Sequence, residues 1–251
     1  MEIFEQGSDW WFFRMFRELD DALLQMRVNM TDINVVTVRV TGNPEVALKA
    51  DEIILGQSHW FCEEVRHFVK RVLKRYDMTA KSFFALADEG TAFVGTWLEL
   101  ALGADRCYVL DDPDIKVQLG VSAVNGGSYL MGNDLTRLET RFLANPQEAE
   151  EVLKNTGLFE AAKADDLGLA TEVLDEIDWE DEIRVYIEER ASYSPDALTG
   201  MEANLRFAGP ETLETKIFGR LTAWQNWIFQ RPNAVGDTGG LQSYGTPTRP
   251  E

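Results

Sequence analysis

Hydrophobic positions in the first half of the chain alternate between helical and strand-like spacing. Over residues 11–29, apolar side chains recur every three or four positions, which predicts an amphipathic helix with Asp9 as its N-cap. The β-branched run 35–40 predicts a strand that ends at a Gly-Asn-Pro turn. A second helical stripe covers 61–76, and the unbroken apolar run 82–87 predicts a buried strand.

The next segment continues this alternation. A glycine-bearing turn leads into a short apolar helix over 96–103, and two short strands are predicted at 107–110 and 115–119. Because helices and strands follow one another along the chain, the first half is predicted to fold as an α/β domain.

Beyond about residue 145 the pattern becomes mostly helical, with one strand predicted at 170–173. Segment 211–230 carries an apolar stripe too broad for a free surface helix, so we expect it to pack on the main domain or on another subunit. The last 21 residues contain four glycines and three prolines and are expected to be irregular. The predicted organisation is a core domain, a helical region and a tail, over residues 1–193, 194–230 and 231–251.

The charge of the chain narrows the classes of partner. It has 251 residues with 43 acidic and 24 basic side chains, a net charge of −19. Such a surface repels phosphate backbones and anionic lipid, so we expect no nucleic-acid and no membrane partner. Solvated helix faces explain the acidity, and adaptation to a salt-rich host would explain it equally well.

Other features favour a cytoplasmic location. No apolar run approaches the ~20 residues of a membrane-spanning helix. The acidic start over residues 1–5 is unlike a secretory leader. Cys62 and Cys107 are too few for a disulfide framework, so we expect two reduced thiols.

Several common catalytic motifs are missing from the sequence. There is no Gly-x-x-x-x-Gly-Lys loop, no Gly-x-Gly-x-x-Gly fingerprint and no Gly-x-Ser-x-Gly elbow. His59 and His67 have no carboxylate or thiol at zinc-ligand spacing, so no metal site is predicted. A nucleophile pair of histidine with Cys62 or Cys107 stays open as a minor alternative. Acid–base chemistry would otherwise rely on carboxylates, and electrophilic help on backbone amides.

The most informative segment is 87–106. A buried strand there enters a glycine-bearing turn that opens directly into a short helix. This geometry directs free amides to a helix N-terminus, where developing negative charge is stabilised. Thr96 and Glu99 also have capping-box spacing, which alone would explain both residues. The pattern therefore leaves two roles open for Glu99, helix capping and acid–base chemistry.

The same segment resembles the second oxyanion turn of the crotonase (enoyl-CoA hydratase/isomerase) superfamily, in which a glycine-rich turn precedes Glu-Leu-Ala and then Asp-Arg. The resemblance covers nearly the whole chain. It is most specific over residues 9–11 with 17–22, 194–200 through 231–236, and 219–229, which are similar to one family of ring-cleaving lyases that act on an aromatic CoA thioester. Chains of that family are about twice as long, and this sequence resembles their C-terminal half. The resemblance implies a crotonase-like ββα superhelix whose C-terminal helices pack at a subunit interface.

The resemblance also implies roles for individual residues. Glu99 corresponds to the first catalytic glutamate, while Leu48 and Thr96 correspond to the residues whose backbone amides form the oxyanion hole. The second catalytic glutamate is replaced by Ala123, whose methyl group cannot transfer a proton. Hydration shared between two carboxylates is therefore not expected from this chain alone.

Three interpretations follow. The chain is a subunit or half of a ring-cleaving lyase whose partner unit supplies paired glutamates, or a stand-alone enoyl-CoA hydratase/isomerase-like enzyme that uses Glu99 alone, or a non-catalytic crotonase-like scaffold. A coenzyme A thioester would be the substrate, and no tightly bound cofactor is expected. The chain would form a homo-oligomer or pair with a second crotonase-like subunit.

Overall fold

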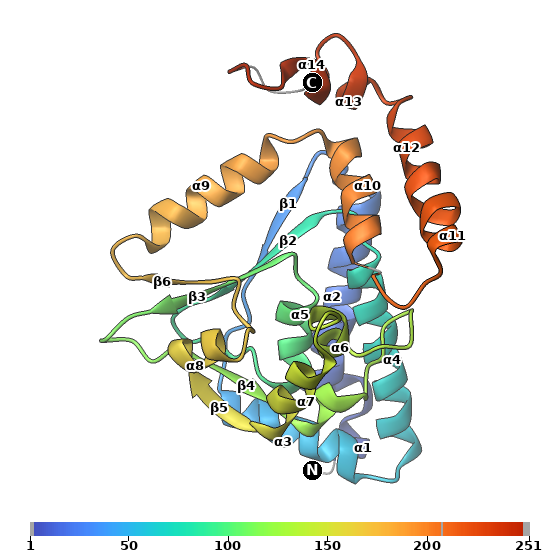
Figure 1. Ribbon diagram of the computed structural model, residues 1–251. Coiled ribbons are helices and arrows are strands. Elements are labelled where there is room, and N and C mark those ends of the chain that lie inside the picture. The colour runs from blue at the N-terminus through green and yellow to red at the C-terminus, as the bar shows by residue number, and fades with distance from the viewer. Residues whose placement is uncertain (1–2, 207, 248–251) are drawn as a thin grey trace.

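A four-stranded parallel sheet lies at the centre of the computed structural model, which describes residues 3–206 and 208–247 (Figure 1). Its strands lie in the order β1-β2-β3-β6. Their bounds are Val35–Val38 for β1, Ser82–Ala87 for β2, Arg106–Asp111 for β3 and Glu172–Asp175 for β6. The predicted α/β fold is confirmed. The strand predicted at 170–173 lies two residues further along as β6.

β2 is buried along its whole length because helices cover both faces of the sheet. Successive side chains of a strand point to opposite faces. Phe83 accordingly stacks on Tyr76 of α4 (Trp60–Asp77), with ring centroids 4.2 Å apart. Phe84 lies instead beneath Arg190 of α9 (Trp179–Ala191), whose guanidinium carbon is 5.5 Å from the ring centroid.

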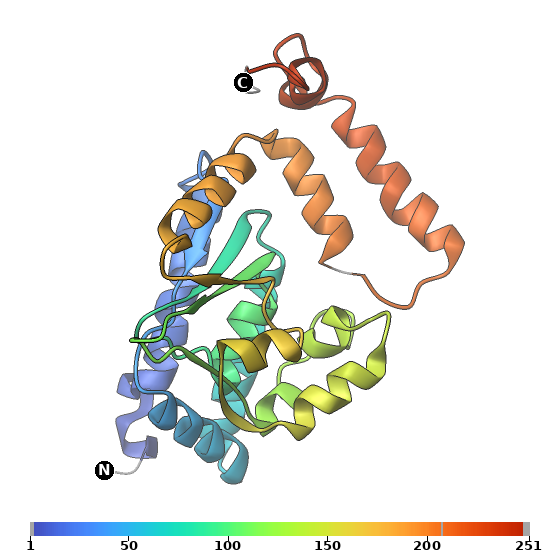
Figure 2. The same ribbon diagram turned by 60° about the vertical axis from the view of Figure 1, so that its left-hand side comes forward.

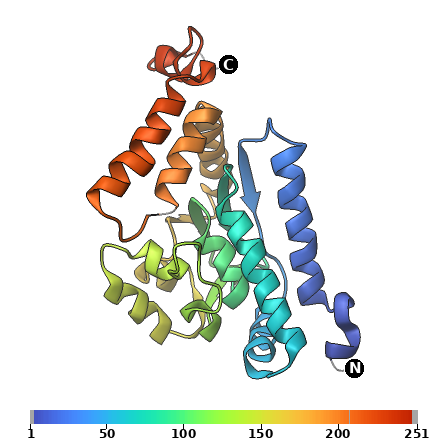
Figure 3. The ribbon, with the colours of Figure 1, turned by 90° about the vertical axis from the view of Figure 1, so that its right-hand side faces the viewer.

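The two long helices of the first half match the predicted periodicity. α2 (Trp11–Val28) and α4 lie side by side against the sheet (Figure 3). The expected N-cap of α2 is wrong: Asp9 ends a 3-10 turn (Gly7–Asp9) that follows α1 (Ile3–Gln6), and Trp10 precedes the helix without a side-chain cap.

α3 (Pro44–Gly56) is a helix that the hydrophobic pattern did not predict. The side chain of Asn43 accepts hydrogen bonds from the amides of Glu45 and Val46, and Pro44 occupies the first helical position. Both are strong helix-start signals. The same Asn-Pro pair also fits the end of a strand, and for that reason the sequence did not predict α3.

A small second sheet pairs β4 (Gln118–Val121) antiparallel to β5 (Gly157–Glu160). β4 begins three residues later than the strand predicted at 115–119, and β5 was not predicted. Two short helices, α5 (Leu98–Leu102) and α8 (Ala161–Asp166), contact this sheet, while α6 (Arg137–Arg141) and α7 (Pro146–Lys154) contact each other.

The C-terminal region is helical, as predicted, and begins with α10 (Pro195–Leu205). α11 (Leu213–Lys216) and α12 (Thr222–Ile228) are joined by a π-helical segment, Ile217–Leu221, into one arm that stands away from the core and meets it through α10 (Figure 2).

The tail is more ordered than predicted, because α13 (Pro232–Val235) and α14 (Gly240–Ser243) form within it. The last four residues of the tail prediction, 248–251, lie outside the described part of the chain. Among the described helices, none combines the length and the apolar character needed to cross a membrane.

Candidate functional site

The glycine-bearing turn before α5 forms as predicted, but its hydrogen bonds differ from those of a capping box. Gly95–Trp97 is a 3-10 turn that runs directly into α5, and neither segment has a side-chain cap. The hydroxyl of Thr96 donates instead to Oδ1 of Asp51, at 2.5 Å. The capping explanation for Thr96 and Glu99 is therefore wrong.

Asp51 of α3 also engages the backbone of this turn. The amide of Thr96 donates to Oδ2 of Asp51 at 3.2 Å, and the hydroxyl of Ser122 donates to the same oxygen at 2.8 Å. Burial raises the pKa of the Asp51 carboxyl to about 6, against the opposing effect of these hydrogen bonds. The Thr96 amide, which was predicted to donate to a substrate oxygen, thus already donates to a carboxylate of the chain itself.

Leu48 lies in the second turn of α3, one helical turn before Asp51. Backbone amides at that depth of an α-helix donate to the carbonyl four residues earlier. Assigning Leu48 and Thr96 to an oxyanion hole stays a prediction. It requires Asp51 to leave the Thr96 amide and the helix to open near Leu48.

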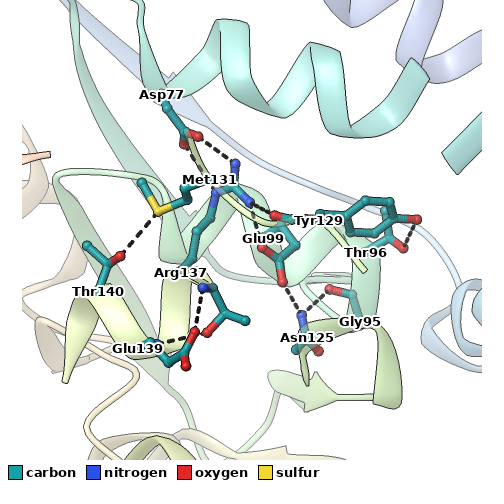
Figure 4. A network of polar contacts seen from close by, with 11 residues as sticks. Asp77, Gly95, Thr96, Glu99, Asn125, Tyr129, Met131, Arg137, Glu139 and Thr140 are labelled. Carbon is teal, nitrogen blue, oxygen red and sulfur yellow. Dashed lines mark hydrogen bonds and ion pairs between the residues drawn. The ribbon is translucent and has the colours of Figure 1, made fainter. Parts of the chain in front are cut away.

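Glu99 is 2% exposed, and both of its carboxylate oxygens are held by neighbours (Figure 4). Oε1 accepts a hydrogen bond from Nδ2 of Asn125 at 2.7 Å, and Oε2 accepts one from Nη1 of Arg137 at 2.8 Å. Burial raises the pKa of Glu99, while Arg137 and Asn125 act to lower it. The role of Glu99 as a crotonase-like acid or base stays a prediction, and in the structure its carboxylate forms part of a closed polar network.

Arg137 connects Glu99 to a second buried carboxylate (Figure 4). Its Nε and Nη2 donate to the two oxygens of Asp77, at 3.2 and 2.7 Å, and its Nη1 also donates to the carbonyl of Tyr129 at 3.1 Å. Burial alone would lower the pKa of Arg137, but the two carboxylates outweigh it and raise that pKa. One guanidinium thus serves two buried carboxylates, and removing it would leave both without a counter-charge.

The loop that was expected to lack a second glutamate contributes an amide instead. Ala123 is exposed at the start of the 3-10 turn Ala123–Gly126. Two residues further, Nδ2 of Asn125 donates to Glu99 and to the carbonyl of Gly95 at 2.9 Å, while its Oδ1 accepts from the amide of Ser122 at 3.0 Å. Asn125 therefore joins this loop to the turn before α5, and the sequence signal for it was its place two residues after Ala123.

The thiol and imidazole groups do not form a second site. His59 caps α4 by accepting from the amide of Phe61 at 3.2 Å. Cys62 and Cys107 are buried and reduced, and burial raises the pKa of Cys107 to about 11, which disfavours the reactive thiolate. Within the described ranges, no group of three or more metal-ligating side chains comes together.

Comparison with solved structures shows that the parallel sheet and the strand–turn–helix site belong to a crotonase fold. The enoyl-CoA hydratase of Bacillus anthracis superposes with a TM-score of 0.70 at 16% identity, over 95% of this chain and 88% of that one. An enoyl-CoA hydratase/isomerase of Cupriavidus metallidurans gives a TM-score of 0.66 at 20% identity, over 94% and 87%. These similarities establish the fold.

Sequence similarity identifies a closer relative. The chain is 47% identical over 247 residues to benzoyl-CoA-dihydrodiol lyase of Aromatoleum evansii. The match covers 98% of this chain and 44% of that protein, so the chain spans less than half the length of this relative. No known family profile matches. The chain therefore has a crotonase fold, and its sequence is similar over nearly its whole length to part of benzoyl-CoA-dihydrodiol lyase.

Proposed function

We propose that the chain is one crotonase-like unit of a ring-cleaving lyase that acts on benzoyl-CoA-dihydrodiol or on the corresponding epoxide, 2,3-epoxybenzoyl-CoA, and that a partner unit supplies the paired glutamates. The partial coverage of the relative supports this proposal, because the chain matches 44% of that protein. The remainder has room for a second unit of similar size.

The observation that carries the proposal is the closed site of this chain. Crotonase-type chemistry needs a carboxylate free to transfer a proton and amides free to stabilise an enolate oxygen. Here the Thr96 amide is bonded to Asp51, and both oxygens of Glu99 are bonded to Asn125 and Arg137. With Ala123 at the second position, no open catalytic pair forms among residues 3–206 and 208–247.

Assembly with the partner would use the helical arm of residues 211–230. Large side chains on it are exposed, among them Leu213 at 68%, Phe218 at 71% and Leu221 at 54%. Contiguous apolar surface of this kind marks interfaces between subunits. A homo-oligomer would bury the same side chains. Determining which chains the assembly contains therefore distinguishes a homo-oligomer from a complex with the partner unit.

The proposal is tested by reconstitution. The chain and a glutamate-bearing crotonase unit are purified separately and together, and ring cleavage of benzoyl-CoA-dihydrodiol is measured for each. We expect turnover only in the mixture. Turnover by this chain alone would instead support a stand-alone enzyme that uses Glu99, with the Leu48 and Thr96 amides freed on binding. Full activity of the partner alone would support a non-catalytic scaffold.

A further inference from the structure

A second cluster of charge lies at the opposite end of α5 from Thr96. A cavity of about 360 Å³ opens there between the end of α5, α6 and α10. Although the chain has a net charge of −19, five arginines line this cavity. They are Arg106, Arg137, Arg141, Arg190 and Arg206.

Two of these arginines are neutralised by carboxylates of the chain. Arg137 is paired with Asp77, as described above. Nη2 of Arg206 lies 2.7 Å from a carboxylate oxygen of Asp105 and 3.0 Å from one of Glu202. The positive charges of Arg137 and Arg206 are therefore already compensated by carboxylates of the chain.

The other three form no ion pair with a carboxylate of residues 3–206 or 208–247. Arg141 donates from Nε to the carbonyl of Gly168 at 2.5 Å and from Nη2 to that of Ala170 at 3.0 Å. Arg190 donates from Nη1 to the hydroxyl of Ser82 at 3.1 Å. Arg106 is exposed at the start of β3. Each guanidinium carries five N–H donors, so most of their donors remain for a ligand.

Among the three arginines, Arg141 gives the strongest reason to expect a bound anion in this cavity. Its side chain is half-buried, and burial lowers its pKa. Removing even part of a charged group from water is costly unless an opposite charge accompanies it, and backbone carbonyls offer only partial compensation. The carboxylates and phosphates that guanidinium groups bind with two parallel hydrogen bonds would supply the missing charge.

The apolar part of the cavity restricts the ligand further. Leu102, Met131, Met201 and Leu205 line it together with the arginines. Met201 and Leu205 of α10 are exposed, 36% and 65%, although a bound apolar group would cover them. Methionine side chains adapt to aromatic rings and contact them favourably through sulfur.

We infer that this cavity binds a small organic carboxylate with an apolar body, held by Arg106, Arg141 and Arg190 at its charged end and by Met131, Met201 and Leu205 at its apolar end. The volume lies within the range of small-molecule sites. This inference does not rest on the proposed function, because none of these three arginines contacts the Thr96 turn or Glu99.

Calorimetric titration of the full chain tests the site with three probes: benzoate, acetate and inorganic phosphate. Benzoate should bind at least about tenfold more tightly than acetate, since burying an aromatic ring contributes that much. Phosphate binding as tight as benzoate binding would overturn the apolar half of the inference. Failure of benzoate to saturate the chain at millimolar concentration would overturn the whole.

Variants locate the binding. The double variant Arg106→Gln/Arg190→Gln should weaken benzoate at least tenfold, while Arg184→Gln, an exposed arginine on α9, should leave it unchanged. Met201→Glu places a negative charge at the cavity and should abolish binding without disturbing the ion pairs of the fold. Unaltered benzoate affinity in both test variants would refute the site, and circular dichroism of each confirms that it is folded.

Discussion

An added Cβ on Gly95 would lie 1.7 Å from Oδ2 of Asp51, so these two residues leave no space for a side chain between them. Gly95 also has a φ of +51°, which other residues rarely adopt. Gly95→Ala should therefore lower the free energy of unfolding by about 3 kcal/mol or more. Gly90→Ala is the matched control, because Gly90 has a φ of +73° and open space around it. If urea denaturation gave the same loss of unfolding free energy for both variants, the Asp51 side chain would have to move to make room for the added methyl group.

Arg137 should be the most costly arginine to remove. Arg137→Met leaves Asp77 and Glu99 buried without their cation, which typically costs about 3–5 kcal/mol. Arg75→Met is the control, because the Arg75–Asp20 pair is only partly buried, and about 1 kcal/mol is expected. Denaturant unfolding of both variants measures the contrast. A small loss in Arg137→Met would mean that the two carboxylates are protonated in the folded chain.

Glu99→Gln separates proton transfer from positioning. In the proposed assembly, turnover should stay within a few-fold, while stability falls because Arg137 loses one charged partner. A catalytic Glu99 would instead lower turnover by about 10²–10⁴-fold. Glu139→Gln, in the capping box of α6, serves as a control that keeps its cap. Steady-state assays of the reconstituted mixture decide between the two outcomes.

The buried carboxyl of Glu202 should make the free energy of unfolding depend on pH. Burial raises its pKa from 4.5 to about 7 in the folded chain. The folded state therefore binds more protons than the unfolded state between these values, so stability falls as the pH rises through that window. Glu202→Gln should flatten the fall between about pH 5 and 7, whereas the exposed control Glu180→Gln should not. Thermal unfolding across this range measures the slope, and an unchanged slope in Glu202→Gln would contradict the prediction. Asp51, with a pKa of about 6, adds a fall of the same sign at lower pH.

The helical arm should control assembly. Phe218→Asp introduces a charge into its exposed apolar surface and should prevent association with the partner or with a second copy. Val28→Asp is a control at an exposed apolar position on α2, 68% exposed and far from the arm in sequence. Sedimentation velocity of the mixtures reports the result. Association that persists in Phe218→Asp would place the interface elsewhere.

Local patterns predicted much of the fold but little of the polar site. The runs that became β2, α2 and α4 bury a continuous stripe or face, and such periodicity is visible in the sequence. α3 was missed because its Asn43–Pro44 start also fits the end of a strand. Without this helix the contact between Asp51 and Thr96 could not be predicted, since α3 carries that carboxylate to the Thr96 turn.

Arg137 could not have been found in the same way. Its partners Asp77 and Glu99 come from different helices, α4 and α5, and only tertiary packing brings them together. The resemblance to crotonases singled out Glu99, which the structure places in α5 directly after the Gly95–Trp97 turn. It contained no information on the arginine that holds it.

The order of the central sheet has a consequence for synthesis of the chain. β3 receives its outer neighbour β6 only after β4, β5 and several helices, because Tyr108–Asp111 pairs with Glu172–Asp175. On the ribosome, the outer edge of β3 thus stays unpaired until the chain has grown past Asp175, and open edges recruit other chains. Fragments that end before Glu172 should aggregate as they emerge, so a soluble unit has to extend beyond β6.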